Sequence, residues 1–296
     1  MNAATDVFAA PPPAPPALPA PVRAPGIGEA IGLLALYFVI QLAVGVLVGA
    51  LVGLVVGLRV GLAHGSAKAA GDTTMHALKA AMSDPDLLTG VTAVTLLIAA
   101  SITLWIARRR WPRQWRLAPA WQGFGFAPSS SYAFYAAALA LGVAVPMIGG
   151  MLTHWLAGSH PVTQSIAQMG HNASVGGRVV LALLAVTLAP LVEETLFRGV
   201  LFSSLLGFRH QRQARFPAVG RTRLALAMGV SALLFGMVHL PDMAWNWSAV
   251  PALALLGLGC AWLRLASGSL WPAVMAHGVN NLLAVAGWFV VMHPPG

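Results

Sequence analysis

The sequence predicts an all-α protein, a polytopic bundle of transmembrane helices with about seven spans. Of its 296 residues, 58% are hydrophobic and only 8% are charged, whereas soluble globular proteins average about 25% charged residues. The mean hydropathy of +0.76 also excludes disorder for most of the chain, because disordered segments contain few apolar residues. An ordinary soluble enzyme is therefore excluded, and an integral membrane protein is expected.

Seven apolar segments are long enough to cross a bilayer, which takes roughly 20 helical residues. They lie at 31–58, 87–107, 131–157, 177–206, 223–240, 249–266 and 269–292. The first is long enough to tilt or break, the fifth and sixth are short, and 59–86 could add an interfacial helix. We therefore expect six to eight helices and no sheet.

Composition divides the chain into three regions. Residues 1–26 are rich in proline and alanine and are expected to form a disordered cytoplasmic tail. This tail lacks the basic stretch of a cleaved secretory signal. Residues 27–125 are expected to hold N-terminal transmembrane helices and an amphiphilic loop. Residues 126–292 are expected to form the functional core, because the polar residues within spans concentrate after residue 190.

Basic residues set the expected orientation. With the N-terminus in the cytoplasm, 12 of the 17 lysines and arginines fall on the cytoplasmic side and four on the other, as the positive-inside rule favours. The basic residues flank apolar segments, so the net charge of +9 indicates contact with anionic lipid headgroups and no nucleic-acid partner. The arginine-rich, lysine-poor composition is typical of a bacterial protein, and we expect it in the inner membrane.

Six glycines recur every four residues along and just beyond the first apolar segment: Gly45, Gly49, Gly53, Gly57, Gly61 and Gly65. Small residues at this spacing let two helices approach closely. The expected partner is another helix of the same chain, with dimerisation as the alternative. The oligomeric state stays open at this point.

One apolar segment carries three ionisable residues, Glu193, Glu194 and Arg198. Charges within a span cost about 2.5–3.5 kcal/mol each on insertion scales and therefore indicate function. Glu194 and Arg198 are four residues apart and can pair on one helix face. Glu193 points about 100° away around the helix, so we expect it to face a different partner.

The partners expected for Glu193 lie on two later apolar segments. One segment carries His239, and the other carries His277 and Asn281, which are four residues apart and share a helix face. Counting residues from the cytoplasmic ends of the segments places Glu193, His239 and His277 in one shared layer. The sequence therefore predicts an intramembrane pocket that is reached from the cytoplasmic side.

Two kinds of hydrolysis fit these residues. Glu193 could take a proton from water with the help of His239, while His277 and Asn281 donate to the developing oxyanion. Alternatively, Glu193, His239 and His277 could bind zinc, with water in the open position. Both mechanisms use activated water rather than a covalent nucleophile, and zinc is the one candidate cofactor.

The motifs resemble those of the CPBP family of intramembrane proteases, which groups type II CAAX prenyl endopeptidases with bacteriocin-processing and lysostaphin-resistance-protein-A-like proteins. Glu-Glu-x-x-x-Arg, Phe-x-x-x-His and His-x-x-x-Asn occur in this order on successive apolar segments. The resemblance implies an endopeptidase, often described as a metalloprotease, that cleaves a peptide or membrane-associated protein and has its core at 126–292. By this resemblance, Glu193 is the base that activates water and His239 is its partner.

The resemblance gives supporting roles to the other four residues. Glu194 and Arg198 are the essential supporting pair, and His277 and Asn281 stabilise the oxyanion. Each role has a structural alternative, because the charged pair could be purely structural and the other two residues could hydrogen-bond between helices. The coincidence of all three motifs favours the enzyme.

A non-catalytic membrane protein is the second hypothesis, either a proton-coupled transporter or a scaffold that confers immunity by binding. Intramembrane glutamate and histidine also build proton relays. Transporters usually show internal repeats, however, and the two halves of this sequence share no convincing repeat. Zinc and aspartyl intramembrane proteases fit less well, because the sequence has neither a His-Glu-x-x-His motif nor an aspartate within a predicted span.

Overall fold

The computed structural model describes residues 23–63, 67–115, 123–158, 165–207 and 220–290. Every regular element within these ranges is helical and none is a strand, which confirms the all-α prediction. Residues 1–22 of the predicted tail, Gly65, and parts of the arginine-rich runs 108–116 and 209–223 lie outside the described residues.

In chain order the α-helices are α1 (Ile27–Ala63), α2 (Ala67–Met82), α3 (Pro85–Arg110), α4 (Ala133–Ala157), α5 (Ser165–Asn172), α6 (Val175–Leu183), α7 (Ala189–Glu194), α8 (Phe202–Leu206), α9 (Arg221–Met237), α10 (Val250–Ser267) and α11 (Trp271–Val290). Two π-helical segments, η3 (Leu184–Leu188) and η4 (Thr195–Leu201), join α6, α7 and α8 into one long interrupted helix. The remaining short elements are 3₁₀ turns: η1 (Pro112–Trp115), η6 (Pro241–Met243) and η7 (Trp247–Ala249).

Six helices within the described residues are long and apolar enough to cross a membrane. They are α1, α3, α4, the interrupted helix over 175–206, α10 with the turn before it, and α11. The fifth predicted span corresponds to α9, which is shorter, at 17 residues. The protein is thus an integral membrane protein whose helices agree with the prediction of about seven spans.

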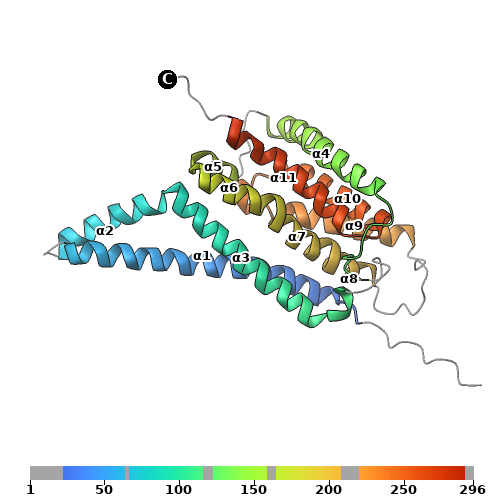
Figure 1. Cartoon of the computed structure of the whole chain (residues 1–296), viewed down its shortest axis with the longest axis horizontal. Helices are drawn as coiled ribbons and strands as arrows, with labels where there is room; N and C mark the ends of the chain where they lie inside the picture. The colour runs from blue at the N-terminus through green and yellow to red at the C-terminus, as the bar shows by residue number, and fades with distance from the viewer. Residues whose placement is uncertain (1–22, 64–66, 116–122, 159–164, 208–219, 291–296) are drawn as a thin grey trace, which may run out of the picture.

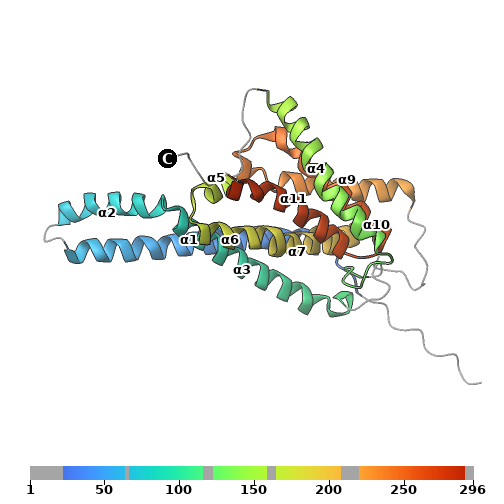
Figure 2. The ribbon, with the colours of Figure 1, turned by 45° about the horizontal axis from the view of Figure 1, so that its top comes forward.

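The interrupted helix lies at the centre of the molecule, between α3 and α11 (Figures 1 and 2). On one side of it, α1 packs against α3. On the other side, α10 packs against α4, α9 and α11, and α4 also packs against α11. Figure 2 shows α4 crossing α10 and α11. The C-terminal half of α1 and the antiparallel α2 form a hairpin that extends beyond the bundle (Figure 1).

The glycine repeat of α1 packs against another helix, α2, along only part of its length. A Cβ at Gly53 would lie 3.8 Å from Leu78, and one at Gly57 would lie 3.8 Å from Thr74, both on α2. Gly45, Gly49 and Gly61 have no atom of another residue within 4 Å of the Cβ position among the described residues. The expected packing within the chain therefore holds for the middle of the repeat.

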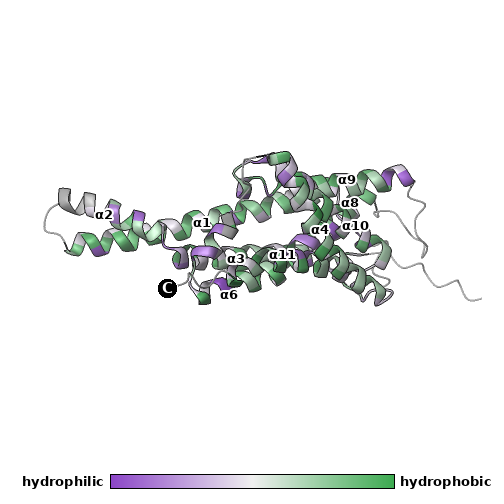
Figure 3. Cartoon of the chain, turned by 90° about the horizontal axis from the view of Figure 1, so that it is seen from above, coloured by the Kyte–Doolittle hydropathy of each residue, from purple (hydrophilic) through white to green (hydrophobic). Residues whose placement is uncertain are grey.

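Many large apolar side chains of the spans are exposed, and Figure 3 shows that hydrophobic residues predominate along these helices. Examples are Leu42 of α1, Leu97 of α3, Met151 of α4 and Leu282 of α11, which are 69%, 48%, 75% and 50% exposed. Apolar surfaces of this extent mark contact with a membrane or a partner. They fit helices surrounded by lipid.

Pro190 explains how the interrupted helix and α11 are held together. In a π-helical turn each amide bonds the carbonyl five residues earlier, as Ala189 does with Leu184. The next such bond would join residue 190 to Ala185, but proline has no N–H. Asn281 of α11 donates to the Ala185 carbonyl instead, from Nδ2 at 2.8 Å. This bond fixes α11 beside the two glutamates of α7.

Close contact between α4 and α11 depends on a glycine. A Cβ on Gly142 would lie 2.6 Å from the Val279 Cβ and 2.7 Å from the Ala276 carbonyl oxygen. We therefore expect Gly142→Ala to lower the free energy of unfolding by about 1–3 kcal/mol, the usual cost of overpacking. Gly150→Ala on the same helix is the control, because no atom lies within 4 Å of its Cβ position. Thermal melting in one detergent compares the variants, and equal melting temperatures would contradict the prediction.

Candidate active site

The predicted site residues come from separate parts of the chain and meet where α7, α9 and α11 converge. They lie at the end of α7 (Glu193 and Glu194), in η4 (Arg198), in the turn after α9 (His239) and in α11 (His277 and Asn281). The first five form one network of ion pairs and hydrogen bonds. Asn281 is attached to the neighbouring π-helical turn instead.

Glu194 is fully buried and paired. Its Oε1 accepts a hydrogen bond from Arg198 Nη1 at 3.1 Å and another from His277 Nδ1 at 3.0 Å. The exposed fractions of the Glu194, Arg198 and His277 side chains are 0%, 0% and 4%. Arg198 also donates from Nη2 to the Gly257 carbonyl at 3.0 Å, which ties α10 to the same network. The i, i+4 pair expected from the sequence is thus present.

Glu193 faces the two histidines. Its Oε2 lies 3.6 Å from His239 Nε2 and 3.9 Å from His277 Nε2. Both distances exceed a direct hydrogen bond and suit groups that are bridged by a water molecule. The Glu193 and His239 side chains are 16% and 23% exposed, so this part of the network is open while the Glu194 part is closed.

Hydrogen bonds on the far side of each ring fix which nitrogen faces Glu193. His239 Nδ1 lies 2.7 Å from the Phe235 carbonyl oxygen, and His277 Nδ1 bonds the Glu194 carboxylate. A carbonyl and an ionised carboxylate only accept, so both Nδ1 atoms carry hydrogen. In the neutral rings, Nε2 is therefore an unprotonated acceptor directed toward Glu193.

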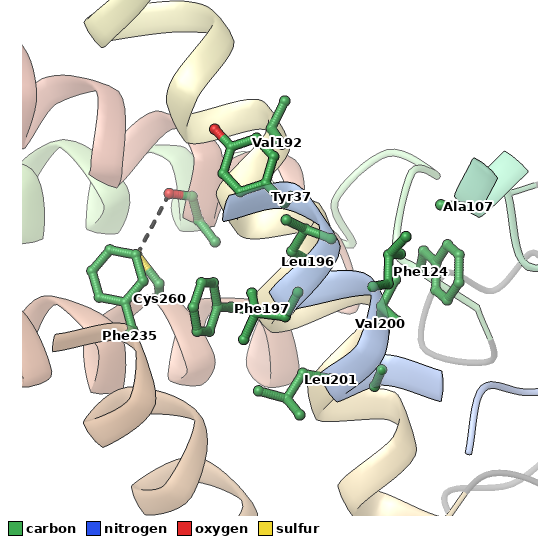
Figure 4. Close-up of a cluster of buried hydrophobic side chains, with 14 of the residues drawn as sticks. Tyr37, Ala107, Phe124, Val192, Leu196, Phe197, Val200, Leu201, Phe235 and Cys260 are labelled. Carbon is green, nitrogen blue, oxygen red and sulfur yellow. Dashed lines mark hydrogen bonds between the residues drawn. The ribbon is translucent and has the colours of Figure 1, made fainter. Parts of the chain in front are cut away.

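An aromatic layer lies beneath the charged groups. The Phe235 ring is 4.9 Å from the His239 ring and 5.4 Å from the His277 ring, and the Arg198 guanidinium lies 4.5 Å above it. Figure 4 shows Phe235 beside Phe197 and the buried Cys260, whose thiol donates to the Ala273 carbonyl at 3.6 Å. Such apolar surroundings strengthen the charged interactions.

Asn281 contacts none of the other five site residues. Its Nδ2 donates to the Ala185 carbonyl, and its Oδ1 accepts from Asn280 Nδ2 at 3.2 Å. One amide hydrogen is left over, because the amide group has two. Its observed contacts position α11 against the interrupted helix.

A zinc ion needs three or four side-chain ligands around one point. Two histidines with engaged Nδ1 atoms and a carboxylate are the residue types that zinc prefers. Within the described residues, however, no three His, Cys, Asp or Glu side chains are arranged to hold a metal ion. The predicted zinc site is therefore not confirmed among the described residues.

Sequence reasoning does not single out two residues that shape the site. Phe235 supplies the carbonyl that holds His239 and the ring beneath the Arg198 guanidinium. Its position in the Phe-x-x-x-His motif is the sequence feature that could have identified it. Gly257 supplies the carbonyl that accepts from Arg198, and a Cβ there would lie 2.8 Å from the Ala232 Cα. No sequence signal identifies Gly257, because its role depends on how α9 and α10 pack.

Comparison with known proteins gives one match. Residues 175–283 match the family model described as type II CAAX prenyl endopeptidase Rce1-like, whereas no curated protein and no solved structure matches the chain. The matched part runs from α6 into α11 and contains all six predicted site residues. The chain is thus a polytopic membrane protein whose residues 175–283 match the model of the Rce1-like, CAAX-type protease family, and the predicted CPBP resemblance is confirmed.

Proposed function

We propose that the protein is an intramembrane endopeptidase that hydrolyses a peptide bond of a membrane-associated protein or peptide with water activated by Glu193 and His239. The observation that carries this proposal is the different environment of two adjacent carboxylates. Glu194 is buried and neutralised by Arg198, whereas Glu193 is partly open and faces two ring nitrogens. A structural ion pair needs only the first of these carboxylates.

The proposed reaction begins with water held between Glu193 and His239. Glu193 takes one proton as the water oxygen bonds to the carbonyl carbon of the substrate, whose carbonyl oxygen becomes an oxyanion. The C–N bond then breaks as the nitrogen receives that proton from Glu193. The products are a new carboxyl terminus and a new amine, and the enzyme returns to its starting state.

Stabilisation of the oxyanion falls to His277 and to the remaining amide hydrogen of Asn281, as the family resemblance implies. His277 donates from Nε2 only as an imidazolium, because its Nδ1 hydrogen is engaged by Glu194. Glu194 and Arg198 therefore act by holding His277 in place.

The experiment uses the full-length chain in vesicles of phosphatidylethanolamine and phosphatidylglycerol. The probes are a farnesylated CAAX peptide and a library of single-span membrane peptides, with products identified by mass spectrometry. We expect the protein to cleave at least one probe. We also expect cleavage to persist after dialysis against a chelator, and elemental analysis of the same sample measures its metal content. Loss of cleavage that zinc restores would overturn the metal-free mechanism. A folded protein that cleaves no probe would favour the non-catalytic transporter or immunity protein.

A further inference from the structure

Tyr37 brings a hydroxyl from α1 to the edge of the active site. Its side chain is buried, with the residue only 2% exposed, in the same apolar cluster as Val192 and Leu196 of the interrupted helix. Figure 4 shows its ring beside Val192, next in sequence to Glu193, with the hydroxyl directed away from Phe197. Tyr37 lies outside the residues that match the family model.

The Tyr37 ring lies beside the turn of α7 that carries the reacting carboxylate, because Val192 immediately precedes Glu193. The charges of Glu193 and Asp242 both act on the phenol. No hydrogen bond of this hydroxyl occurs among the described residues, and its oxygen is not one of the buried side-chain atoms that lack a partner. The oxygen is therefore accessible although the rest of the side chain is buried, and it can bond to a small molecule. Its partner is therefore expected to come from outside the chain, from water or substrate at Glu193.

The proposed reaction has only one unengaged neutral donor among the six predicted site residues. His277 donates to an oxyanion only when it is charged, because Glu194 occupies its Nδ1 hydrogen. Asn281 donates one amide hydrogen to the Ala185 carbonyl, which leaves a single amide hydrogen for the oxyanion. A phenol needs no change of charge to donate, and at neutral pH it keeps its hydrogen.

We propose that Tyr37 is a further catalytic residue, whose hydroxyl donates a hydrogen bond to the carbonyl oxygen of the scissile bond as that oxygen becomes an oxyanion. This inference rests on the proposed peptidase function. It makes α1 part of the active site, although the family model begins at residue 175. The hydroxyl adds no charge to the site and keeps its proton throughout the reaction.

The test is Tyr37→Phe, which removes the hydroxyl and keeps the ring that packs against Val192. Loss of one oxyanion donor is expected to lower kcat roughly 10²–10³-fold, with KM and the melting temperature unchanged. Tyr135→Phe on α4 is the matched control, because it makes the same chemical change away from the site. An unchanged kcat, or an effect confined to KM, would overturn the role of Tyr37.

A second measurement separates this inference from the proposed function. A trifluoromethyl ketone built on the cleaved peptide hydrates to a tetrahedral analogue of the intermediate, which a catalytic oxyanion donor binds more tightly than the substrate. We expect Tyr37→Phe to weaken analogue binding by the factor lost from kcat. Suppose that the wild type cleaves and Glu193→Gln does not. If Tyr37→Phe then keeps full activity and binds the analogue tightly, only the role of Tyr37 is refuted. If wild type cleaves no probe, both proposals fail.

Discussion

Glu193→Gln is expected to slow peptide cleavage by roughly 10²–10⁴-fold, the contribution typical of a positioned general base. Glutamine keeps the size of the side chain but cannot take a proton from water. Because the Glu193 carboxylate lies 3.6 Å from His239 and is 16% exposed, its replacement leaves the buried Glu194–Arg198 pair intact. The initial rate of cleavage in vesicles, normalised to folded protein, measures the effect.

Glu29→Gln is the matched control for this variant. Glu29 begins α1, pairs with Arg23 and Arg110, and has a 28% exposed side chain. The same change of charge at this remote position is expected to leave the rate unchanged. A Glu193→Gln protein that cleaves as fast as wild type would remove Glu193 from the mechanism.

Arg198→Met is expected to lower the free energy of unfolding by about 3–5 kcal/mol, the usual result of breaking a buried ion pair. Methionine fills much of the space but leaves the Glu194 carboxylate buried with His277 as its remaining partner. It also frees the Gly257 carbonyl that Arg198 bonds. Thermal melting and the yield of monodisperse protein in detergent report the loss.

The double variant Glu194→Gln/Arg198→Met shows whether unpaired charge causes that loss. Neutralising Glu194 removes the buried charge, and the glutamine oxygen can still accept from His277 Nδ1. We expect the double variant to melt closer to wild type than Arg198→Met does, yet to cleave slowly, because His277 loses the ion pair that positions it. A double variant that melts no higher than Arg198→Met would refute this explanation.

Much of the site follows from helical spacing. The four-residue separation of Glu194 and Arg198 predicts their pairing, and the roughly 100° offset of Glu193 predicts that it faces other partners. Both arrangements are present in the structure. The shared layer with His239 and His277 also follows, because helix length fixes depth in a bundle of spans.

The contacts of Asn281 could not be predicted from spacing. Its bond to Ala185 exists because a π-helical turn directs that carbonyl at Pro190, which has no hydrogen to give. A straight α-helix would instead direct the Ala185 carbonyl to the Ala189 amide. The register of a helix interruption depends on packing with α11, which sequence periodicity does not encode.

Two features of the fold could not be decided from the sequence. The first apolar segment, which is long enough to tilt or break, forms one unbroken helix of 37 residues with α2 folded back against it. Arg264, near the end of an apolar segment, is 3% exposed and donates to the Gly123 carbonyl at 2.7 Å. Long-range packing decides both, and the same holds for the position of Tyr37 on α1.

The decisive measurement is a single turnover of peptide cleavage in H₂¹⁸O, followed by mass spectrometry of the product and of the enzyme. If Glu193 activates water for direct attack, the new carboxyl group of the product carries one ¹⁸O atom after the first turnover and Glu193 carries none. Product incubated with Glu193→Gln in the same water controls for exchange. A first-turnover product without ¹⁸O, or label in the Glu193 carboxylate, would mean that Glu193 attacks the substrate itself and would contradict activation of water.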